Sequence, residues 1–314
     1  MIVKQASKND IPNIVELLKL SLGESVIEKS STIWNFKHAD NPFGSSHVLV
    51  ATDDKDIFVG VRAFMKWNWQ LENQVWVAYR AVDTATHPDF QGKGIFKKLT
   101  LKALDDVQEN QETFVFNTPN DKSRPGYLKM GWVVVDSLPI AIVPTIMYIF
   151  RSFFRKKRVY SNQIQNEKLD ELCKVHNHVL SEKKSIFTPK SATYLKWRFE
   201  ENPMQKYKVV STNDSYVAMY IKKRRFFKEL RVVEIISSNE SIHKKVIQNA
   251  IIDYAIQNRC WITTLANKDL FRLRLYGKFG PKLTFKSLTE DDLFVKKALD
   301  INNWKYSLGD LELF

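Results

Sequence analysis

The spacing of apolar residues predicts that the chain opens with a helix. Between residues 11 and 22 apolar side chains recur every three or four positions, which places them on one helix face. Ser7 and Asp10 stand where a helix N-terminus is capped, and Pro12 falls in the first turn, where proline is tolerated. We therefore expect a helix over 11–22.

Three strands are predicted next. Alternating or continuous apolar runs occupy His47–Ala51, Phe58–Trp69 and Val75–Thr86. The polar segments 53–56 and 72–74 separate them and have the composition of hairpin turns. The runs are therefore expected to form consecutive antiparallel strands.

A glycine-containing turn and a second helix follow the strands. The turn is Phe-Gln-Gly-Lys-Gly at residues 90–94, and apolar residues then recur at helical spacing over 95–107. Short apolar runs at Thr113–Asn117 and Gly131–Val135 predict two further strands with a helix between them. This order predicts an α/β (α+β) fold with a mixed, mainly antiparallel sheet flanked by helices.

The second half of the chain repeats landmarks of the first. A Trp-x-Phe pair, an asparagine and a Tyr-x-x-x-Gly element occur twice in the same order, at Trp34–Phe36, Asn117 and Tyr127–Gly131 and at Trp197–Phe199, Asn267 and Tyr276–Gly280. The ordered set indicates an internal duplication. We expect two domains, at 1–145 and 161–314, joined by an apolar and basic connector at 146–160.

Composition narrows the class of protein. With 314 residues and 44% hydrophobic side chains, the chain can bury two cores, which excludes disordered and fibrous classes. Two cysteines, Cys173 and Cys260, allow at most one disulfide and cannot form a cysteine zinc site. The first residues contain no apolar run of signal-peptide length, so we expect a cytoplasmic protein.

Residues 137–150 carry no charge and run into a basic segment. Pro139 and Pro144 interrupt this run, which is too short to cross a bilayer as a helix. An apolar segment followed by basic residues is also the pattern of a peripheral membrane anchor. We favour a final sheet strand followed by a basic interdomain helix.

The charge is divided unequally along the chain. Residues 1–150 hold 16 Lys and Arg against 17 Asp and Glu, which leaves 32 of the 48 basic and 18 of the 35 acidic residues for 151–314. The second half is therefore strongly basic, which suits a nucleic acid, an anionic membrane or a phosphorylated substrate. Only Arg155–Arg158 and Lys222–Arg225 are dense, so we favour a solvated surface and expect no nucleic-acid partner.

The glycine turn has the composition of an anion-binding loop. Two glycines one residue apart between a strand and a helix let successive N–H groups point into one concavity, and the helix dipole adds positive potential. The spacing fits neither a P-loop nor a dinucleotide fingerprint.

Gln91-x-x-Gly94-x-Phe96 resembles the Q/R-x-x-G-x-G/A acetyl-CoA motif of the GNAT N-acetyltransferase superfamily. Asn117 and the Tyr127-x-x-x-Gly131-Trp132 element resemble that family's later strand asparagine and tyrosine element. The resemblance implies tandem GNAT-like domains, N-acyltransferase activity and acetyl-CoA as co-substrate. Phe96 departs from the pattern, because the family usually has a small residue there.

The resemblance also implies roles for individual residues. The pyrophosphate of acetyl-CoA would be bound by the N–H groups of Gln91, Gly92, Lys93, Gly94, Ile95 and Phe96. The pantetheine arm would contact the backbone of Thr84, Ala85 and Thr86 on one side and Asn117 on the other. Tyr127 would donate a proton to the leaving thiolate, although it could instead be a packing residue. No metal is needed.

The general base has several candidates. Asp83 is an acid within an apolar strand, which fits either a catalytic role or a structural hydrogen bond. His87 precedes a proline and could be a turn residue, and His38 is a third candidate.

The residues that would bind the acceptor amine also have two interpretations. Trp34, Phe36 and His38 could stack on a flat acceptor such as a sugar ring. The recurrence of the aromatic pair at Trp197 and Phe199 favours packing instead.

The second repeat has no glycine turn. Residues 232–246 run from strand to helix without a glycine, and Ser238, Asn239 and Ser241 are typical helix caps. We therefore expect one active domain and one degenerate domain.

The leading hypothesis is an acetyl-CoA-dependent N-acetyltransferase acting on the amine of a small acceptor, an amino sugar or an amino-acid derivative. Two alternatives are a tandem-domain aminoacyl transferase that uses charged tRNA and a basic binding module without catalysis.

Overall fold

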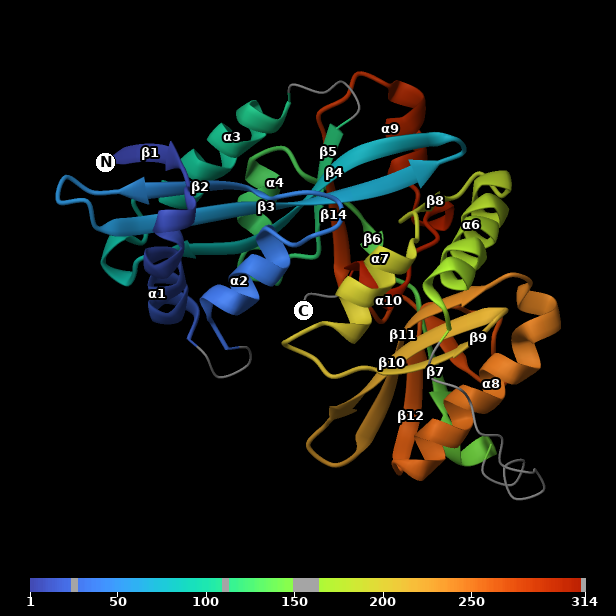
Figure 1. Cartoon of the computed structure of the whole chain (residues 1–314). Helices are drawn as coiled ribbons and strands as arrows, with labels where there is room; N and C mark the ends of the chain where they lie inside the picture. The colour runs from blue at the N-terminus through green and yellow to red at the C-terminus, as the bar shows by residue number, and fades with distance from the viewer. Residues whose placement is uncertain (24–27, 109–112, 149–163, 312–314) are drawn as a thin grey trace. The chain divides into compact units, whose positions relative to one another are not determined.

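The computed structural model describes residues 1–23, 28–108, 113–148 and 164–311, and the chain divides into two compact units (Figure 1). Unit 1 contains residues 1–70, 74–136 and 282–301. Unit 2 contains residues 71–73, 137–281 and 302–314. Each unit is built around its own sheet.

Unit 1 begins as the sequence predicts. Its first elements are β1 (Ile2–Gln5), the 3₁₀ turn η1 (Lys8–Asp10), α1 (Ile11–Leu22) and α2 (Ser31–His38). The N–H of Ser7 donates to Asp10 Oδ2 at 2.8 Å, which satisfies one of the free donors at this helix start. The predicted helix over 11–22 is confirmed.

The sheet of unit 1 carries the three predicted strands at its centre. Its strands are β2 (His47–Thr52), β3 (Phe58–Leu71), β4 (Gln74–Thr86), β5 (Thr113–Asn117), β6 (Val133–Ser137) and β14 (Lys282–Ser287), in the order β1-β2-β3-β4-β5-β14-β6. The pairs β1–β2, β2–β3 and β5–β14 are antiparallel, and β4–β5 is parallel.

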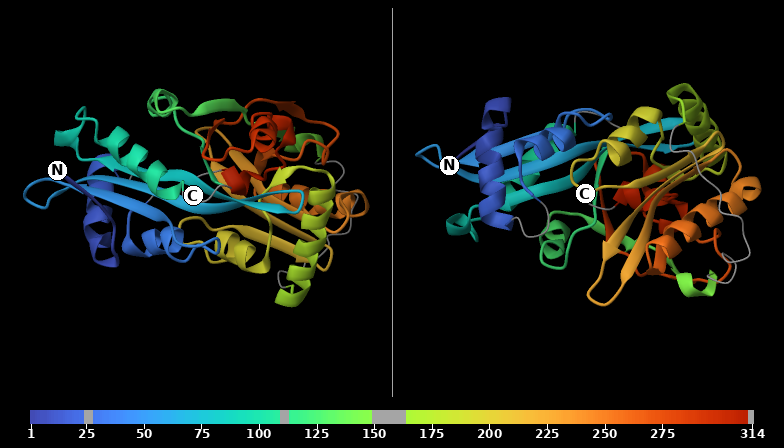
Figure 2. Two further views of the ribbon diagram at one scale, coloured as in Figure 1. Left: turned by 90° about the horizontal axis from the view of Figure 1, so that it is seen from above. Right: turned by 60° about the horizontal axis from the view of Figure 1, so that its bottom comes forward.

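Helices cover both faces of this sheet (Figure 2). Helix α3 (Ile95–Val107) lies on one face, and α1 and α2 lie on the other. Gly60 on β3 allows α3 to approach closely, since a Cβ there would lie 2.6 Å from Ile95 Cγ2 and 2.9 Å from Leu99 Cδ1. The remaining helical elements of unit 1 are η2 (Pro88–Phe90), α4 (Arg124–Lys129) and α9 (Asp292–Ala298).

Unit 2 repeats this order of elements. Its elements are β7 (Ile140–Pro144), η3 (Thr145–Tyr148), α6 (Asn166–Glu182), β8 (Ile186–Phe187), α7 (Ala192–Leu195), the π-helical turn η4 (Lys196–Glu200), β9 (Lys208–Thr212), β10 (Ser215–Lys223), β11 (Lys228–Ser237), α8 (Glu240–Gln257), β12 (Cys260–Leu265), β13 (Leu275–Gly277) and α10 (Leu308–Leu311), with η5 (Ile301–Asn303) at the boundary. The sheet order is β13-β7-β12-β11-β10-β9, and β11–β12 is parallel.

The element orders match the predicted duplication. In both units a short helical segment with the Trp-x-Phe pair precedes three strands, then a helix, then a strand parallel to the third. Two mixed, mainly antiparallel sheets flanked by helices confirm the predicted fold class. The tyrosines differ, however, because Tyr127 lies in helix α4 and Tyr276 in strand β13.

Each sheet includes strand residues from the other half of the sequence. Strand β7 pairs with β12, with Val143 opposite Thr263, and β14 pairs with β5, with Thr284 opposite Asn117. The compact units therefore do not follow the predicted boundaries at 145 and 161. The apolar run 137–150 does contain a strand, but its pattern does not specify which sheet it joins.

Other expectations concern the connector and the cysteines. Most of the predicted connector, with the basic cluster Arg155–Arg158, lies outside the described residues. Cys173 and Cys260 are buried free thiols. Among the helices that the structure describes, none is long and apolar enough to cross a membrane.

Candidate active site

The glycine turn presents a row of free backbone donors. Gly92 and Gly94 have φ values of 77° and 75°, a backbone conformation that favours glycine, and Gly94 is the N-cap of α3. A Cβ at either position would meet nothing within 4 Å. The N–H groups of residues 92–96 donate to no acceptor in the described part of the chain. The Gln91 N–H, which is also predicted to bind the pyrophosphate, instead donates to the Pro88 carbonyl at 3.3 Å. The turn at the start of a 13-residue helix can therefore receive an anion such as a pyrophosphate.

The pairing of β4 with β5 ends several residues before β4 does. The parallel pairing of β4 and β5 runs from Val77 opposite Thr113 to Arg80 opposite Phe116. Strand β4 continues to Thr86, with a positive φ of 41° at Asp83 that breaks its regular path. The predicted pantetheine contacts at 84–86 thus lie beyond the last residue that pairs with β5, although the Thr86 carbonyl accepts from Ser21 Oγ at 3.1 Å.

Asn117 lies just past the end of the same pairing, on β5. It follows Phe116, the last β5 residue paired with β4, and is buried. Its Oδ1 and its carbonyl both accept from the hydroxyl of Thr284 on β14. Thr84 and Asn117, which the resemblance assigns to the pantetheine site, therefore both lie past the last paired residues of β4 and β5.

Tyr127 is buried on the α3 face of the sheet. Its Oη accepts a hydrogen bond from Arg62 Nη1 at 2.7 Å, and its ring lies edge-on to Phe96 with centroids 5.4 Å apart. Phe96, the departure from the family pattern, fits because a Cβ at Gly126 would lie only 3.0 Å from Phe96 Cε1. The large residue at 96 is thus accommodated by the glycine before Tyr127.

Arg62 is a site residue that the sequence analysis does not single out. It is fully buried on β3, and its Nη1 donates to the hydroxyls of both Tyr127 and Thr84. It therefore links the proposed general acid to the strand that would bind the thioester. The signal was present in the sequence, because Arg62 is a charged residue in the apolar run Phe58–Met65.

Asp83 points to the opposite face, where it forms an ion pair. Its Oδ2 accepts from Lys37 Nζ and, at 2.9 Å, from His38 Nε2. Burial raises the pKa of Asp83, but the charge of Lys37 and the hydrogen bond from His38 outweigh it and hold the pKa well below its usual range. A carboxylate held ionised in this way is a poor proton acceptor near neutral pH.

The predicted acceptor residues belong to this same buried cluster. Trp34 and His38 are 7% and 4% exposed, and their rings lie 4.0 Å apart. Burial lowers the pKa of His38 while Asp83 opposes the shift, and Ser46 Oγ lies 2.8 Å from His38 Nδ1. The structure supports the packing interpretation of both side chains. His87 begins the η2 turn, where its Nδ1 accepts from the Asp89 N–H.

We expect Asp83→Asn to destabilise the protein with little effect on catalysis. The change leaves the buried Lys37 ammonium without its carboxylate, a loss on the order of 3 kcal/mol of unfolding free energy. Because the folded pKa of Asp83 is depressed, this stabilisation is present above about pH 4 and is lost as the pH falls toward the folded value. Chemical denaturation at several pH values measures it.

Asp106→Asn is the matched control, because Asp106 pairs with Lys102 and His47 near the surface. We expect it to cost less than about 1 kcal/mol. If Asp83→Asn instead lowered turnover 100-fold or more in a protein of unchanged stability, Asp83 would be the general base.

In unit 2 a side chain caps the N-terminus of α8, the helix that is equivalent to α3. Asn239 Oδ1 accepts from the N–H groups of Ser241 and Ile242 at 3.1 and 3.2 Å, as the cap prediction requires. The first donors of α8 are therefore occupied, whereas those of α3 are free.

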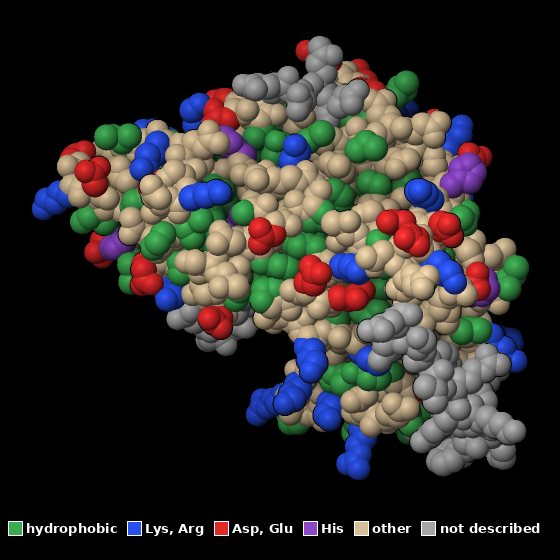
Figure 3. Space-filling view, in the orientation of Figure 1, with side chains coloured by type: hydrophobic (Ala, Val, Ile, Leu, Met, Phe, Trp, Pro, Cys, Tyr) green, Lys and Arg blue, Asp and Glu red, His purple; other side chains and the backbone are tan. Residues whose placement is uncertain are grey.

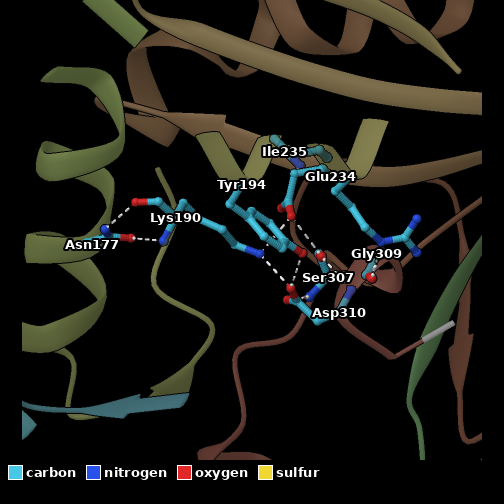
Figure 4. A network of polar contacts seen from close by, with 9 residues as sticks. Asn177, Lys190, Tyr194, Glu234, Ile235, Ser307, Gly309 and Asp310 are labelled. Carbon is cyan, nitrogen blue, oxygen red and sulfur yellow. Dashed lines mark hydrogen bonds and ion pairs between the residues drawn. The ribbon is translucent and has the colours of Figure 1, made fainter. Parts of the chain in front are cut away.

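Unit 2 does repeat the buried acid on its third long strand (Figure 4). Glu234 lies three residues after Arg231 as Asp83 lies three after Arg80, and these two arginines pair with β12 and β5 respectively. Lys190 Nζ lies 2.7 Å from both Glu234 Oε2 and Asp310 Oδ1. An acid at this strand position contacts a lysine in both units, which supports a structural role for Asp83.

Unit 1 has the order of elements and the glycine turn that carry the predicted resemblance to N-acetyltransferases. Residues 3–135 match the family model described as acetyltransferase (GNAT) domain. The chain therefore contains a GNAT domain in its first half, and the predicted resemblance to this superfamily is confirmed.

Solved structures with the same fold cover most of the chain. A GCN5-related N-acetyltransferase from Anabaena variabilis ATCC 29413 has a TM-score of 0.66 and 11% identity over 92% of this chain and 73% of that chain. A conserved protein of unknown function from Enterococcus faecalis V583, a probable N-acyltransferase, has a TM-score of 0.67 and 11% identity over 92% and 72%.

A more distant structure is Saccharomyces cerevisiae N-myristoyltransferase with bound myristoyl-CoA, with a TM-score of 0.53 and 9% identity over 90% of this chain and 82% of that chain. Identities this low establish the fold alone. Among curated protein sequences, none matches this chain.

Proposed function

We propose that the chain is an acetyl-CoA-dependent N-acetyltransferase that acts on the amine of a small acceptor, such as an amino sugar or an amino-acid derivative. The observation that carries the proposal is the free N–H row at residues 92–96, at the start of the helix that follows β4. The GNAT family match over 3–135 supports acyl transfer from a CoA thioester.

Residues of unit 1 would bind the pyrophosphate and the pantetheine arm of the donor. The N–H groups of 92–96 and the start of α3 would bind the pyrophosphate, because donors and helix dipole both favour an anion there. The backbone of Thr84 and Ala85 would contact the pantetheine arm, because it lies beyond the β5 pairing. Acetyl-CoA supplies an activated acetyl group when bound.

The chemistry requires two proton movements. The neutral amine attacks the thioester carbonyl carbon, and the C–S bond breaks with its electron pair on sulfur. The Tyr127 phenol then gives its proton to the thiolate. The nitrogen loses its extra proton to water, because Lys37 and His38 already neutralise Asp83, the carboxylate that the sequence offers as base.

Release of free CoA thiol tests this function directly. The purified full chain is assayed with acetyl-CoA against a panel of amines, amino sugars and polyamines, with Gly94→Val as the inactive control. We expect thiol release that depends on one class of amine. Saturable acetyl-CoA binding without amine-dependent release from any acceptor would favour the non-enzymatic binding module.

The basic cluster of unit 2 is expected to be dispensable for acetyl transfer. Lys and Arg side chains gather at the end of the β10–β11 hairpin (Figure 3), where Lys223 and Arg225 are exposed and Arg224 pairs with Glu229. We expect Lys223→Glu/Arg225→Glu, which spares that ion pair, to leave kcat/KM for a small amine within a few-fold.

The same double variant tests the tRNA alternative. Binding of a charged tRNA through these residues would be saturable near physiological ionic strength, would fall log-linearly with salt, and would weaken on charge reversal. A loss of acetyl transfer as large as that of the inactive control would show that this cluster reaches the acceptor, and would indicate a phosphorylated or nucleotide-linked acceptor.

A further inference from the structure

We propose that Arg62 is a positioning residue of the acyl-transfer site, which holds Tyr127 as a proton donor and places a positive charge where the CoA thiolate forms. The inference rests on the proposed function and assigns a role that no sequence motif indicates. Four features of Arg62 carry it: its burial, its partners, its unused donors and its charge.

The charge of Arg62 is buried without a counter-ion. The side chain is 0% exposed, and within the described residues no carboxylate pairs with it. Its neighbours are two hydroxyls and the rings of Phe64, Phe96 and Tyr127, at 4.8, 5.6 and 5.2 Å from Cζ. A guanidinium buried among aromatic rings is costly for stability, so its presence points to a role in function.

The hydrogen bond to Tyr127 fixes the direction of the phenolic proton. A guanidinium has donors only, so Tyr127 Oη must accept from Arg62 Nη1 and keep its own hydrogen for another acceptor. The Thr84 hydroxyl is arranged in the same way, because it accepts from Arg62 and donates to the Val82 carbonyl at 3.3 Å. The hydrogen of Tyr127 is therefore the one left to reach a leaving group.

Two donors of Arg62 remain unused. Nε and Nη2 are buried, and neither has a hydrogen-bond partner among the described residues. Buried polar groups are nearly always paired, so these N–H groups fit an acceptor that arrives with the substrate. A thioester oxygen or a thiolate sulfur provides such an acceptor.

The proton balance gives Arg62 a role in every turnover. The C–S electron pair goes to sulfur, sulfur takes the phenolic proton, and Tyr127 is left as a phenolate until water restores its proton. Arg62 has donors only and exchanges no proton in these steps. Its positive charge stabilises first the thiolate and then the phenolate, which a neutral side chain at this position could not do.

The test compares Arg62→Met with the parent protein in three measurements. We expect turnover to fall about 100-fold or more, with KM for acetyl-CoA within a few-fold. We expect the melting temperature to stay constant or rise, because a buried unpaired charge is removed. We expect bound CoA to ionise its thiol at a higher pH than in the parent protein, a readout that needs no acceptor.

Arg62→Lys and a double variant complete the test. Arg62→Lys keeps the charge but not the forked geometry, so it should recover part of the turnover. Because part of its effect passes through Tyr127, Arg62→Met should cost less turnover when added to Tyr127→Phe than it costs in the parent protein.

Parent-like turnover and thiol ionisation in Arg62→Met, or a large fall in its melting temperature with no change in thiol ionisation, would overturn the inference. Absence of amine-dependent thiol release from the parent protein would instead count against the proposed function, and the ionisation of bound CoA would still decide the role of Arg62.

Discussion

Gly94→Val is expected to abolish acetyl-CoA binding. Gly94 has a φ of 75°, which a branched residue adopts only with strain, and its Cα faces open space at the start of α3. Valine would therefore distort the row of N–H donors and fill the volume that the pyrophosphate needs. Calorimetric titration with acetyl-CoA is expected to show no saturable heat.

Gly23→Val is the matched control for this substitution. Gly23 has a φ of 69° and also meets nothing within 4 Å, but it ends helix α1, which lies on the other face of the sheet from α3 (Figure 2). We expect it to lower stability by a similar amount and to bind acetyl-CoA normally. Normal binding by Gly94→Val would remove the glycine turn from the site.

Tyr127→Phe is expected to lower turnover by about 10²- to 10⁴-fold while leaving the Kd for acetyl-CoA nearly unchanged. The phenol is assigned to the leaving thiolate, an interaction that the bound thioester does not make. Steady-state kinetics together with calorimetric binding separates the two effects.

Tyr276→Phe provides the control, since Tyr276 is the sequence counterpart of Tyr127 but lies partly exposed on strand β13. Its turnover should equal that of the parent protein. If Tyr127→Phe also kept its turnover, Tyr127 would be a packing residue held between Phe96 and Trp132.

Local patterns predicted the elements of this fold well. In the helix over 11–22 and in the three central strands, the buried face carries the apolar residues. The spacing of those residues along the sequence therefore predicts each element directly. The glycine turn was equally readable, because positive φ and the absence of a side chain both require glycine.

Long-range pairing was not readable from these patterns. Apolar strands such as β7 and β14 fit the pleat of either sheet, so their periodicity cannot show that each joins the sheet of the other half. The charged residues of the site present the same problem. Asp83 is conspicuous in the sequence, but its pairing with Lys37 depends on how α2 packs against the sheet.

Arg62 shows why the candidate site was only partly predicted. A charged residue in an apolar strand can form a structural ion pair or belong to a functional site. Only its neighbours in the folded protein distinguish these roles. The sequence places Arg62 22 positions from Thr84 and 65 from Tyr127, and the fold brings all three hydroxyl and guanidinium groups together.

The number of acetyl-CoA molecules bound per chain distinguishes one active unit from two. Unit 1 has free N–H donors at its glycine turn, whereas Asn239 occupies those of the equivalent helix in unit 2. Calorimetric titration of the full chain is therefore expected to give one acetyl-CoA per chain. Two sites per chain, or protection from proteolysis centred on residues 232–258 instead of the glycine turn, would contradict the account.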